Sequence, residues 1–275
     1  MRIEPIDDPA DPRVADYRDM KDPTLRVRRG LFVAESRAVV RQLLTSGRFR
    51  TRSLLLTPPA LESLRGALQT ANASVPVYVT SHESARALVG FDFHRGCVAL
   101  GERGGALPLG PLLDPTGPRL LVALEDISNP DNVGGLFRNA RAFGADAILL
   151  SAGCGDPLYR KAIRVSMGAS LVTPFTHLAD WAGGLARLRE AGYSLVALTP
   201  DRSAVDIALL GAARPLPARI ALLLGAEGHG LGPESRVAAD LQVRIAMAPE
   251  VDSLNVSTAA GIALHRLRSA ATGTR

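Results

Sequence analysis

The second half of this chain alternates short, almost wholly apolar runs with segments that have the spacing of helices. Runs of this kind lie at residues 120–124, 147–150, 193–198 and 219–224. Unbroken apolar character is typical of parallel strands, which are buried on both faces of a sheet. Strands joined by helices form such sheets. The sequence therefore predicts an α/β domain with one parallel or mostly parallel sheet over residues 119–275.

The first hundred residues show the same alternation on a smaller scale. Strands are expected at 31–34, 52–57, 75–80 and 97–100, and helices at 36–45, 59–71 and 82–89. A short helix that Asp11 caps is expected to reach about Met20. Half of residues 101–118 are Gly or Pro, which is typical of a linker. We therefore expect a small α/β domain at 1–100, a linker at 101–118 and a larger domain at 119–275.

The larger domain has further elements that the same reasoning predicts. A polar loop that begins at Glu125 is expected to lead into a helix that ends near Gly144, and further helices are expected at 158–165, at 180–191 and at 233–239. Residues 171–175 and 241–247 have the character of strands. The chain then ends in a helix of small residues, in which Val256, Ala260 and Leu267 fit one apolar face.

Three polar stretches interrupt this domain, at 129–138, 225–232 and 247–255, and each follows an apolar strand. In an open α/β sheet the loops that follow the strands gather along one edge, where ligands bind. The sequence therefore predicts one shared site that three distant segments build. A helix that merely packs is the plainer interpretation of the last stretch taken alone.

The first and second stretches contain glycines that need a physical reason. Glycine inside a helix costs about 1 kcal/mol relative to alanine, and Gly134 precedes Arg138 by four positions on the same side of the helix. The missing Cβ would leave room for Arg138 or for a substrate backbone, and close helix packing is the alternative. The stretch 225–232 lacks the GxGxxG spacing, but its backbone N–H groups could hold a polar ligand. Its one carboxylate, Glu227, could instead cap a turn.

Composition excludes several other classes of protein. Hydrophobic residues make up 47% and charged residues 21% of the chain, which favours a packed core over disorder. No apolar run approaches the roughly 18 residues of a membrane span, and residues 1–20 lack the apolar core of a signal peptide. Cys97 and Cys154 form no CxxC pair, so a reduced cytosolic compartment is expected.

Charge and motif spacing narrow the chemistry further. The net charge is +5, and nearly all basic residues are arginine, which suits phosphate contacts or reflects codon usage. The cluster Arg26, Arg28 and Arg29 is interpreted as a solvated face or as a phosphate patch. Neither lysine follows a glycine, so there is no P-loop. There is no GxSxG elbow, and the five histidines lack metal-ligand spacing, so no metal is expected.

With these stretches in view, the chain resembles the SpoU/TrmH family of RNA 2′-O-ribose methyltransferases, within the SPOUT superfamily. The first family motif is similar to residues 129–140, the second to 224–231, and the third to 245–257. The N-terminal segments 32–35 and 93–96 resemble the small ribosomal-protein-like domain that many members carry and that binds RNA. The order and separation of the three motifs match the family, and the resemblance covers nearly the whole chain.

The resemblance implies a fold, a cofactor and an assembly. The C-terminal α/β domain would contain a deep trefoil knot, and the N-terminal domain would bind the RNA substrate. The cofactor would be S-adenosylmethionine, which backbone groups at Gly225, Ile245 and Leu254 would contact. Members are typically homodimers, so a second copy of the chain and RNA are the expected partners.

The resemblance also implies roles for five residues. A ribose 2′-hydroxyl would attack the sulfonium methyl group, with Arg138 holding an RNA phosphate beside it. Asn132 and Asn255 would orient the ribose or Arg138, and Glu227 and Ser253 match further polar positions of the family. A guanidinium stays charged in proteins, so the proton acceptor is left open. Ala246 and Pro249 depart from the family pattern, within a loop of the expected cofactor site.

Several functions fit the resemblance, and they differ in substrate and chemistry. The N-terminal domain favours ribosomal RNA as the substrate over transfer RNA. The alternatives are 2′-O-methylation of tRNA, methylation of a base, and a non-catalytic RNA-binding or ribosome-assembly protein with the same fold. The intact set of Asn132, Arg138, Glu227, Ser253 and Asn255 disfavours the non-catalytic alternative.

Overall fold

The computed structural model of the chain describes residues 2–18, 20, 29–71, 74–90, 93, 95–211 and 215–272. The chain forms two compact units. Unit 1 comprises Met1–Gly105 and Leu158–Val172, and unit 2 comprises Ala106–Pro157 and Thr173–Arg275. This division differs from the expected domain boundaries mainly at Leu158–Val172, which belongs by its contacts to unit 1 although it lies within the second half of the sequence.

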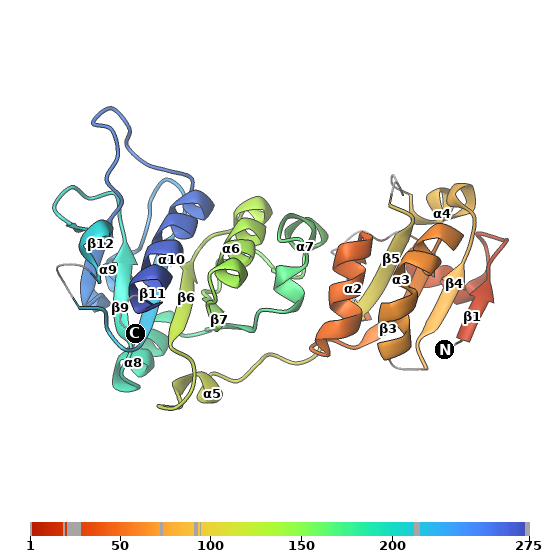
Figure 1. The fold of residues 1–275 in the computed structure, drawn as a ribbon, viewed down its shortest axis with the longest axis horizontal. Helices are drawn as coiled ribbons and strands as arrows, with labels where there is room; N and C mark the ends of the chain where they lie inside the picture. The colour runs from red at the N-terminus through yellow and green to blue at the C-terminus, as the bar shows by residue number, and fades with distance from the viewer. Residues whose placement is uncertain are drawn as a thin grey trace. The chain divides into compact units, whose positions relative to one another are not determined.

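Unit 1 is a five-stranded sheet with helices on both faces (Figure 1). Its elements in chain order are β1 (Arg2–Pro5), η1 (Pro12–Tyr17), β2 (Leu31–Glu35), α2 (Arg37–Ser46), β3 (Thr51–Leu56), α3 (Pro58–Thr70), β4 (Pro76–Val79), α4 (His82–Val89), β5 (Cys97–Glu102), α7 (Arg160–Val165) and η3 (Ala169–Leu171). The strand order is β1-β4-β3-β5-β2, with β1, β4 and β3 parallel and β5 antiparallel to both β3 and β2.

The sequence predicts these elements well, and their ends have local causes. Ser36 and Ser81 accept hydrogen bonds from backbone N–H groups of the helices that they cap, and Gly47 and Gly90 end the same helices in left-handed conformation. Strand β1 was not expected, since it is four residues long and mostly exposed. Of the predicted basic cluster, Arg26 and Arg28 lie outside the described residues, while Arg29 pairs with Asp16 at 2.7 Å.

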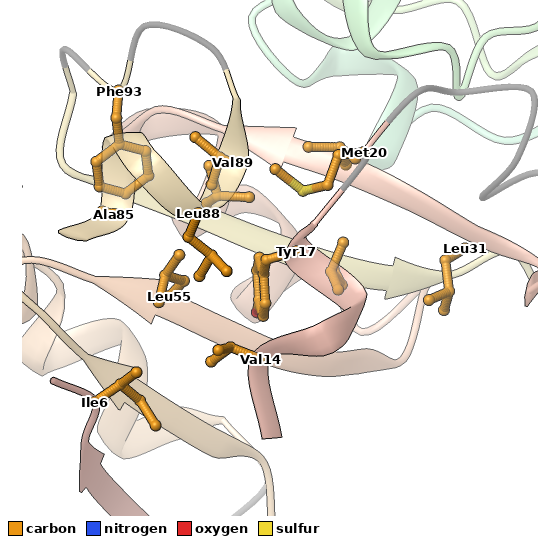
Figure 2. Packing of buried hydrophobic residues seen from close by; sticks show 13 residues of the cluster. Ile6, Val14, Tyr17, Met20, Leu31, Leu55, Ala85, Leu88, Val89 and Phe93 are labelled. Carbon is orange, nitrogen blue, oxygen red and sulfur yellow. The ribbon is translucent and has the colours of Figure 1, made fainter. Parts of the chain in front are cut away.

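One face of the unit 1 sheet packs against η1 and α4 around Tyr17, as Figure 2 shows. The Tyr17 ring is fully buried, and its hydroxyl lies 2.7 Å from the Ser53 hydroxyl. Burial raises the pKa of the Tyr17 phenol far above its ordinary value, so the group stays neutral. This hydrogen bond satisfies a polar atom that the core would otherwise leave unpaired.

The segment Leu158–Val172 packs against β2 and α2 of unit 1. Arg160 donates through Nη2 to Glu35 Oε2 at 2.7 Å. A Cβ at Gly168, whose φ is +81°, would lie 2.7 Å from Gln42 Oε1, so only glycine suits this position. The expected helix at 158–165 is confirmed in its main part, and its side chains contribute to the surface of unit 1.

Unit 2 is a seven-stranded sheet in which every strand pair is parallel. Its elements are α5 (Gly110–Leu113), β6 (Leu120–Glu125), α6 (Pro130–Ala142), β7 (Ala147–Leu150), β8 (Phe175–His177), α8 (Trp181–Glu190), β9 (Ser194–Leu198), β10 (Val205–Asp206), η4 (Ile207–Leu209), β11 (Ile220–Gly225), α9 (Pro233–Ala238), β12 (Leu241–Arg244) and α10 (Val256–Thr272). The strand order is β10-β12-β9-β11-β6-β7-β8. The predicted parallel α/β sheet is therefore confirmed.

Helices cover both faces of this sheet (Figure 1). On one face, alternate strand residues such as Leu121 and Leu223 pack with α8 and with leucines of α5. On the other face lie α6 and α10, side by side, with Phe137 and Leu264 fully buried. Two expectations need correction. The strand expected at 171–175 is Phe175–His177, since Leu171 belongs to η3, and the strand expected at 241–247 ends at Arg244.

The region expected to be a linker contains α5, and its second part is fixed to unit 2. The Arg219 side chain is only 9% exposed and donates to the carbonyl oxygens of Leu112, Asp114, Pro118 and Ala191 at 2.6–3.2 Å. Its guanidinium also stacks 4.0 Å from the centre of the Tyr193 ring. Residues 106–118 thus form part of the folded unit.

Three further observations concern membrane-spanning helices, metal ligands and cysteines. Within the described residues, no helix is long and apolar enough to cross a membrane. Over the same part of the chain, no group of three His, Cys, Asp or Glu side chains is placed to hold a metal ion. Cys97 and Cys154 are free, and burial raises the pKa of the Cys97 thiol to about 11.

Candidate active site

The three polar stretches do meet at one edge of the unit 2 sheet, where β6, β11 and β12 end. Asn255 begins α10, and its side-chain oxygen accepts hydrogen bonds from the backbone N–H groups of Ser257 at 3.0 Å and Thr258 at 3.3 Å. Asn129 caps α6 in the same manner through the N–H of Asp131. Both helices therefore start at fixed points of this edge, and the caps position the side chains of their first turns.

A single side chain joins the three stretches. The amide nitrogen of Asn255 donates to Asn132 Oδ1 and to Glu227 Oε1, both at 2.8 Å. Asn132 is 5% exposed, and a buried oxygen atom that lacks a hydrogen-bond donor lowers the stability of the fold. The Asn255 amide group has two N–H donors, and these two contacts occupy both. We call Asn132, Glu227 and Asn255 the polar triad.

Helices α6 and α10 pack closely against each other next to this triad. A Cβ at Gly135 would lie 2.9 Å from the Ser257 Cβ and nearer still to its hydroxyl, so the contact requires glycine. Asn139 donates to the Ser257 carbonyl oxygen at 2.6 Å. The close helix packing expected as an alternative is therefore found at Gly135. Sequence reasoning missed Asn139, although its place seven residues after Asn132 puts both on similar sides of the helix.

Arg138 lies on the exposed side of α6. Among the described residues, none makes a hydrogen bond or ion pair with its guanidinium. Neither Arg138 nor Asn132 belongs to the lining of the cavity described next. The structure thus presents Arg138 as a cation open to solvent on the helix that carries Asn132.

A cavity of about 460 Å³ opens beside the triad. All three residues expected to contact the cofactor, Gly225, Ile245 and Leu254, line it, together with Glu227, Ser253 and Asn255. The side chains of Leu198, Leu224 and Val256 form an apolar part of its wall. We call it the first cavity. Its size and its mixture of apolar walls with backbone polar groups fit an adenosine-containing cofactor.

The loop that follows β11 is shaped by glycines. A Cβ on Gly225 would collide with the backbone of Gly230 and Leu231, where the loop folds back on itself. Gly230 N donates to Ala226 O at 3.0 Å, and Gly228 and Gly230 have φ values of +91° and +68°. These left-handed conformations favour glycine. The loop therefore presents backbone groups at the wall of the first cavity.

Glu125, which sequence reasoning did not single out, holds the far end of that loop. Its Oε2 accepts a hydrogen bond from Gly232 N at 3.0 Å. Glu125 pairs with Gly225 in the register of β6 and β11, so it stands directly beside the start of the loop. A glutamate that ends an apolar strand next to a glycine-rich loop is the signal by which it could have been found.

Hydrogen bonds with Ser151 also hold the loop between β6 and α6 in place. Asp126 has a φ of +55°, which is unusual for a residue other than glycine. Its N–H donates to Ser151 Oγ at 2.9 Å, and Ser151 Oγ donates to Asp126 Oδ1 at 2.7 Å. Non-glycine residues in this region persist where surrounding contacts hold them. This pair therefore sets the path of the chain into α6 and its first polar side chains.

A parallel sheet with a ligand-sized cavity and a polar side-chain cluster at its carboxyl edge defines a ligand-binding α/β domain. Residues 119–265 match the model of the SpoU rRNA Methylase family. That match covers more than half of the chain, and the chain belongs to this family. It is accordingly an enzyme, an RNA methyltransferase, and the expectation drawn from its motifs is confirmed.

Several known proteins are similar over most of their length. An uncharacterized tRNA/rRNA methyltransferase of Mycobacterium tuberculosis is 38% identical over 272 residues, which cover 97% of this chain and 92% of the relative. A 23S rRNA (guanosine-2′-O-)-methyltransferase, RlmB, of Ralstonia nicotianae is 34% identical and covers 70% of this chain and 76% of its own.

Solved structures agree with these sequence matches. An rRNA methyltransferase from Sinorhizobium meliloti superposes with a TM-score of 0.80 at 25% identity, over 98% of both chains. A structure of an AdoMet-bound rRNA methyltransferase from Sinorhizobium meliloti has a TM-score of 0.78 at 25% identity, over 97% of this chain and 98% of that one. The expected cofactor, S-adenosylmethionine, is confirmed by the family and by this neighbour.

Proposed function

We propose that this protein transfers a methyl group from S-adenosylmethionine to a ribose 2′-oxygen of RNA, and that its substrate is ribosomal RNA. The polar triad beside the first cavity is the observation that carries the proposal, because it joins the three motif segments through Asn255. The relative named RlmB is a 23S rRNA guanosine 2′-O-methyltransferase, which supports the choice of reaction and substrate.

The proposed reaction is a direct displacement at carbon. S-adenosylmethionine supplies a methyl group on a positively charged sulfur. The ribose 2′-oxygen forms a bond to that carbon as the carbon–sulfur bond breaks, and the hydroxyl proton is lost to a base or to solvent. Because such a step needs close alignment of the two reactants, positioning contributes strongly to its rate. The residues of the site are therefore assigned mainly to orientation.

Each site residue has a role that its place supports. Backbone groups at Gly225, Ile245 and Leu254 hold the cofactor in the first cavity. The triad sets the geometry of the cavity mouth, and Ser253 stands on the same loop as Asn255. Arg138, exposed on α6, holds an RNA phosphate, since a guanidinium suits the geometry of a phosphate group.

The decisive test compares the wild-type protein with Arg138→Ala. Purified protein is incubated with labelled S-adenosylmethionine and with unmodified ribosomal or transfer RNA, and the nucleosides are analysed by mass spectrometry. We expect a 2′-O-methylated nucleoside from ribosomal RNA with wild-type protein. For Arg138→Ala we expect loss of at least about a hundredfold in kcat/KM, because a charge-assisted phosphate contact contributes roughly 3 kcal/mol.

The controls of this test distinguish a wrong role for Arg138 from a wrong substrate and from a wrong type of reaction. Cofactor affinity and thermal stability of Arg138→Ala should match wild type, because the side chain is exposed and does not line the cavity. Full activity of this variant would contradict the role of Arg138. Modification of transfer RNA instead would change the assigned substrate, and a methylated base would contradict the reaction type.

We also propose that the protein is a homodimer, as the family resemblance implies. The outer surface of α6 and α10 carries Asn139, Phe143, Thr258, Ile262 and His265 around a shallow hollow. Ile262 is 41% exposed at this hollow, next to Phe143. A helix surface that combines apolar and polar side chains in this way is suited to a symmetric contact between two copies.

The dimer proposal predicts the effect of a charge on this surface. Ile262→Glu should shift the mass in solution from dimer to monomer, as measured by light scattering. Val237→Glu is the matched control, since Val237 on α9 is 86% exposed and lies outside this surface. A dimeric Ile262→Glu variant, or a monomeric wild-type protein, would contradict the assignment.

Two further family features remain proposals. We propose that the C-terminal segment forms a deep trefoil knot, which the place of β12 between β10 and β9 and the shared cavity lining of residues 198–200 and 245–247 support. We propose that unit 1 binds the RNA substrate and that the enzyme works in the cytoplasm. Of the N-terminal motif segments, His94 lies outside the described residues.

A further inference from the structure

Both ends of the glycine-rich loop that follows β11 lie beside one side chain, that of Glu125 on β6. The loop begins at Gly225, which pairs with Glu125 in the parallel register of the two strands. It ends at Gly232, whose N–H donates to Glu125 Oε2 at 3.0 Å. Among the described residues, this is the one hydrogen bond that the Glu125 side chain makes. Glu125 therefore fixes the end of the loop relative to its start.

The loop between these two ends forms a large part of the first cavity. Residues 225–228 and 230 line that cavity. The backbone of the loop closes on itself where Gly230 N donates to Ala226 O, and Glu227 reaches from the loop to Asn255. Neither Glu125 nor Gly232 lines the cavity. Any effect of Glu125 on a ligand in the first cavity must therefore act through the loop.

Gly232 and Glu125 fit closely against each other. A Cβ on Gly232 would lie 2.7 Å from Glu125 Oε1, which is too short for an unstrained contact. The φ of Gly232 is −64°, a value that any residue adopts, so the backbone conformation does not require glycine here. The absent side chain makes room for the carboxylate instead. A carboxylate is also a stronger acceptor for a backbone N–H than a neutral group is.

The neighbouring residue attaches the loop to the sheet in a different way. Leu231 is 5% exposed and packs in the same core cluster as Leu121 and Leu223. This apolar contact does not depend on the Glu125 carboxylate. Loss of the carboxylate should therefore leave the loop attached to unit 2, and its effect should be confined to the conformation of the loop.

We propose that Glu125 is a positioning residue for the cofactor, and that its carboxylate holds the loop 225–232 in the conformation that binds S-adenosylmethionine. This inference rests on the proposed placement of the cofactor in the first cavity. Without the carboxylate, fewer molecules have the competent loop conformation, and the apparent affinity falls in proportion to that fraction. Saturating cofactor restores the competent conformation, so the loss belongs to affinity and to KM, and kcat is preserved.

Calorimetry with S-adenosylhomocysteine tests this inference without turnover. Glu125→Ala removes the acceptor, and Glu125→Gln keeps an acceptor oxygen on a side chain of the same length. Asp146→Ala is the matched control, because Asp146 Oδ2 accepts hydrogen bonds from the N–H groups of Arg119 at 2.8 Å and Leu120 at 2.9 Å, at the opposite end of β6. Asp146 does not line the first cavity.

The expected effect is on affinity. Glu125→Ala should weaken S-adenosylhomocysteine about tenfold, which corresponds to 1.4 kcal/mol. It should raise the KM for S-adenosylmethionine to a similar extent and leave kcat within about twofold. Glu125→Gln should recover most of the affinity, and Asp146→Ala should lower the thermal midpoint without changing the affinity. Hydrogen exchange of the loop amides should be faster in ligand-free Glu125→Ala than in wild type, and S-adenosylhomocysteine should slow it again.

Gly232→Ala tests the same contact from the other side. Its new Cβ displaces the Glu125 carboxylate, so this variant should also weaken S-adenosylhomocysteine. Once Glu125→Ala has removed that carboxylate, Gly232→Ala should weaken the ligand little further. A double-mutant cycle measures this coupling. Losses that simply add would contradict the proposed contact.

Three further outcomes would overturn the inference. The first is an unchanged affinity of Glu125→Ala for S-adenosylhomocysteine, or a loss confined to kcat. The second is an equal loss of affinity in Asp146→Ala, which would make the effect one of general stability. The third is that wild-type protein binds no S-adenosylhomocysteine; in that case the proposed function fails as well, and this differs from a wild-type protein that binds the ligand while Glu125→Ala binds it equally well.

Discussion

At the scale of single residues, Asn255 has two structural tasks. Its oxygen caps α10 through Ser257 and Thr258, and its amide nitrogen bridges Asn132 and Glu227. An asparagine is the residue suited to both, because it alone combines a cap acceptor with two N–H donors at that length. A substitution that separates the two tasks therefore shows which of them the reaction needs.

Asn255→Asp should separate them. The aspartate keeps the cap acceptor, so the start of α10 should be preserved. Its carboxylate also lies beside Glu227 and leaves the buried Asn132 oxygen without a donor, so some loss of thermal stability is expected from this cause and none from the cap. Both donors are lost, and two hydrogen bonds of about 1 kcal/mol each correspond to a loss of roughly thirtyfold in kcat/KM. Asn255→Ala should lose the same activity and also about 1 kcal/mol of stability through the missing cap. Kinetics and thermal melts of the two variants check this, and near-normal activity of Asn255→Asp would exclude a role for the bridge.

The sequence was sufficient to predict which residues gather at this edge, and insufficient to predict how they bond. Asn132, Glu227 and Asn255 follow strands of one parallel sheet, which places them together by topology alone. The bridge through one amide group depends on side-chain orientation over a separation of 123 residues in the chain. The support from Glu125 depends on the register of β6 with β11, which no local pattern encodes.

At the scale of elements, the contact of α6 with α10 determines where two of the three motifs stand. Gly135 lies against Ser257, and Gly261 lies near Asn139, where a Cβ would be 3.3 Å from the amide nitrogen. Small residues on both helices allow this approach. Helix positions and ends were predictable from apolar spacing and caps, whereas the short edge strands β1 and β10 were not, because their few residues carry no clear alternation.

Gly135→Ala should weaken this contact. The new Cβ meets Ser257, so the helices must separate, at a cost of about 1–3 kcal/mol. The higher helix propensity of alanine offsets about 1 kcal/mol of that cost. A net fall in the thermal midpoint is therefore expected, together with a loss of activity, since Asn132 and Asn255 stand on the two helices. Adding Ser257→Gly removes the obstructing atoms and should recover stability in a double-mutant cycle. Strictly additive losses would contradict the contact.

At the scale of the whole molecule, the two compact units differ from the division that composition suggested. Glycine and proline at 101–118 indicated a linker, but residues 106–118 belong to unit 2. The cause is Arg219, which directly precedes β11 and whose hydrogen-bond partners no local sequence pattern indicates. Its four carbonyl acceptors come from Leu112, Asp114, Pro118 and Ala191, and these contacts form only when unit 2 is folded.

The Arg219 contacts predict which part of the molecule a substitution destabilises. Arg219→Leu removes the side chain that donates hydrogen bonds to four carbonyl oxygens and to the Tyr193 hydroxyl oxygen, which should cost roughly 2–4 kcal/mol. Calorimetry should show this loss in the unfolding of unit 2, the transition that S-adenosylhomocysteine raises by binding the native state. Tyr17→Phe, which leaves the Ser53 hydroxyl without its partner in the core of unit 1, should lower the transition that the ligand does not move. If Arg219→Leu lowers both transitions equally, the two units unfold as one cooperative body, and residues 106–118 then stabilise the whole chain.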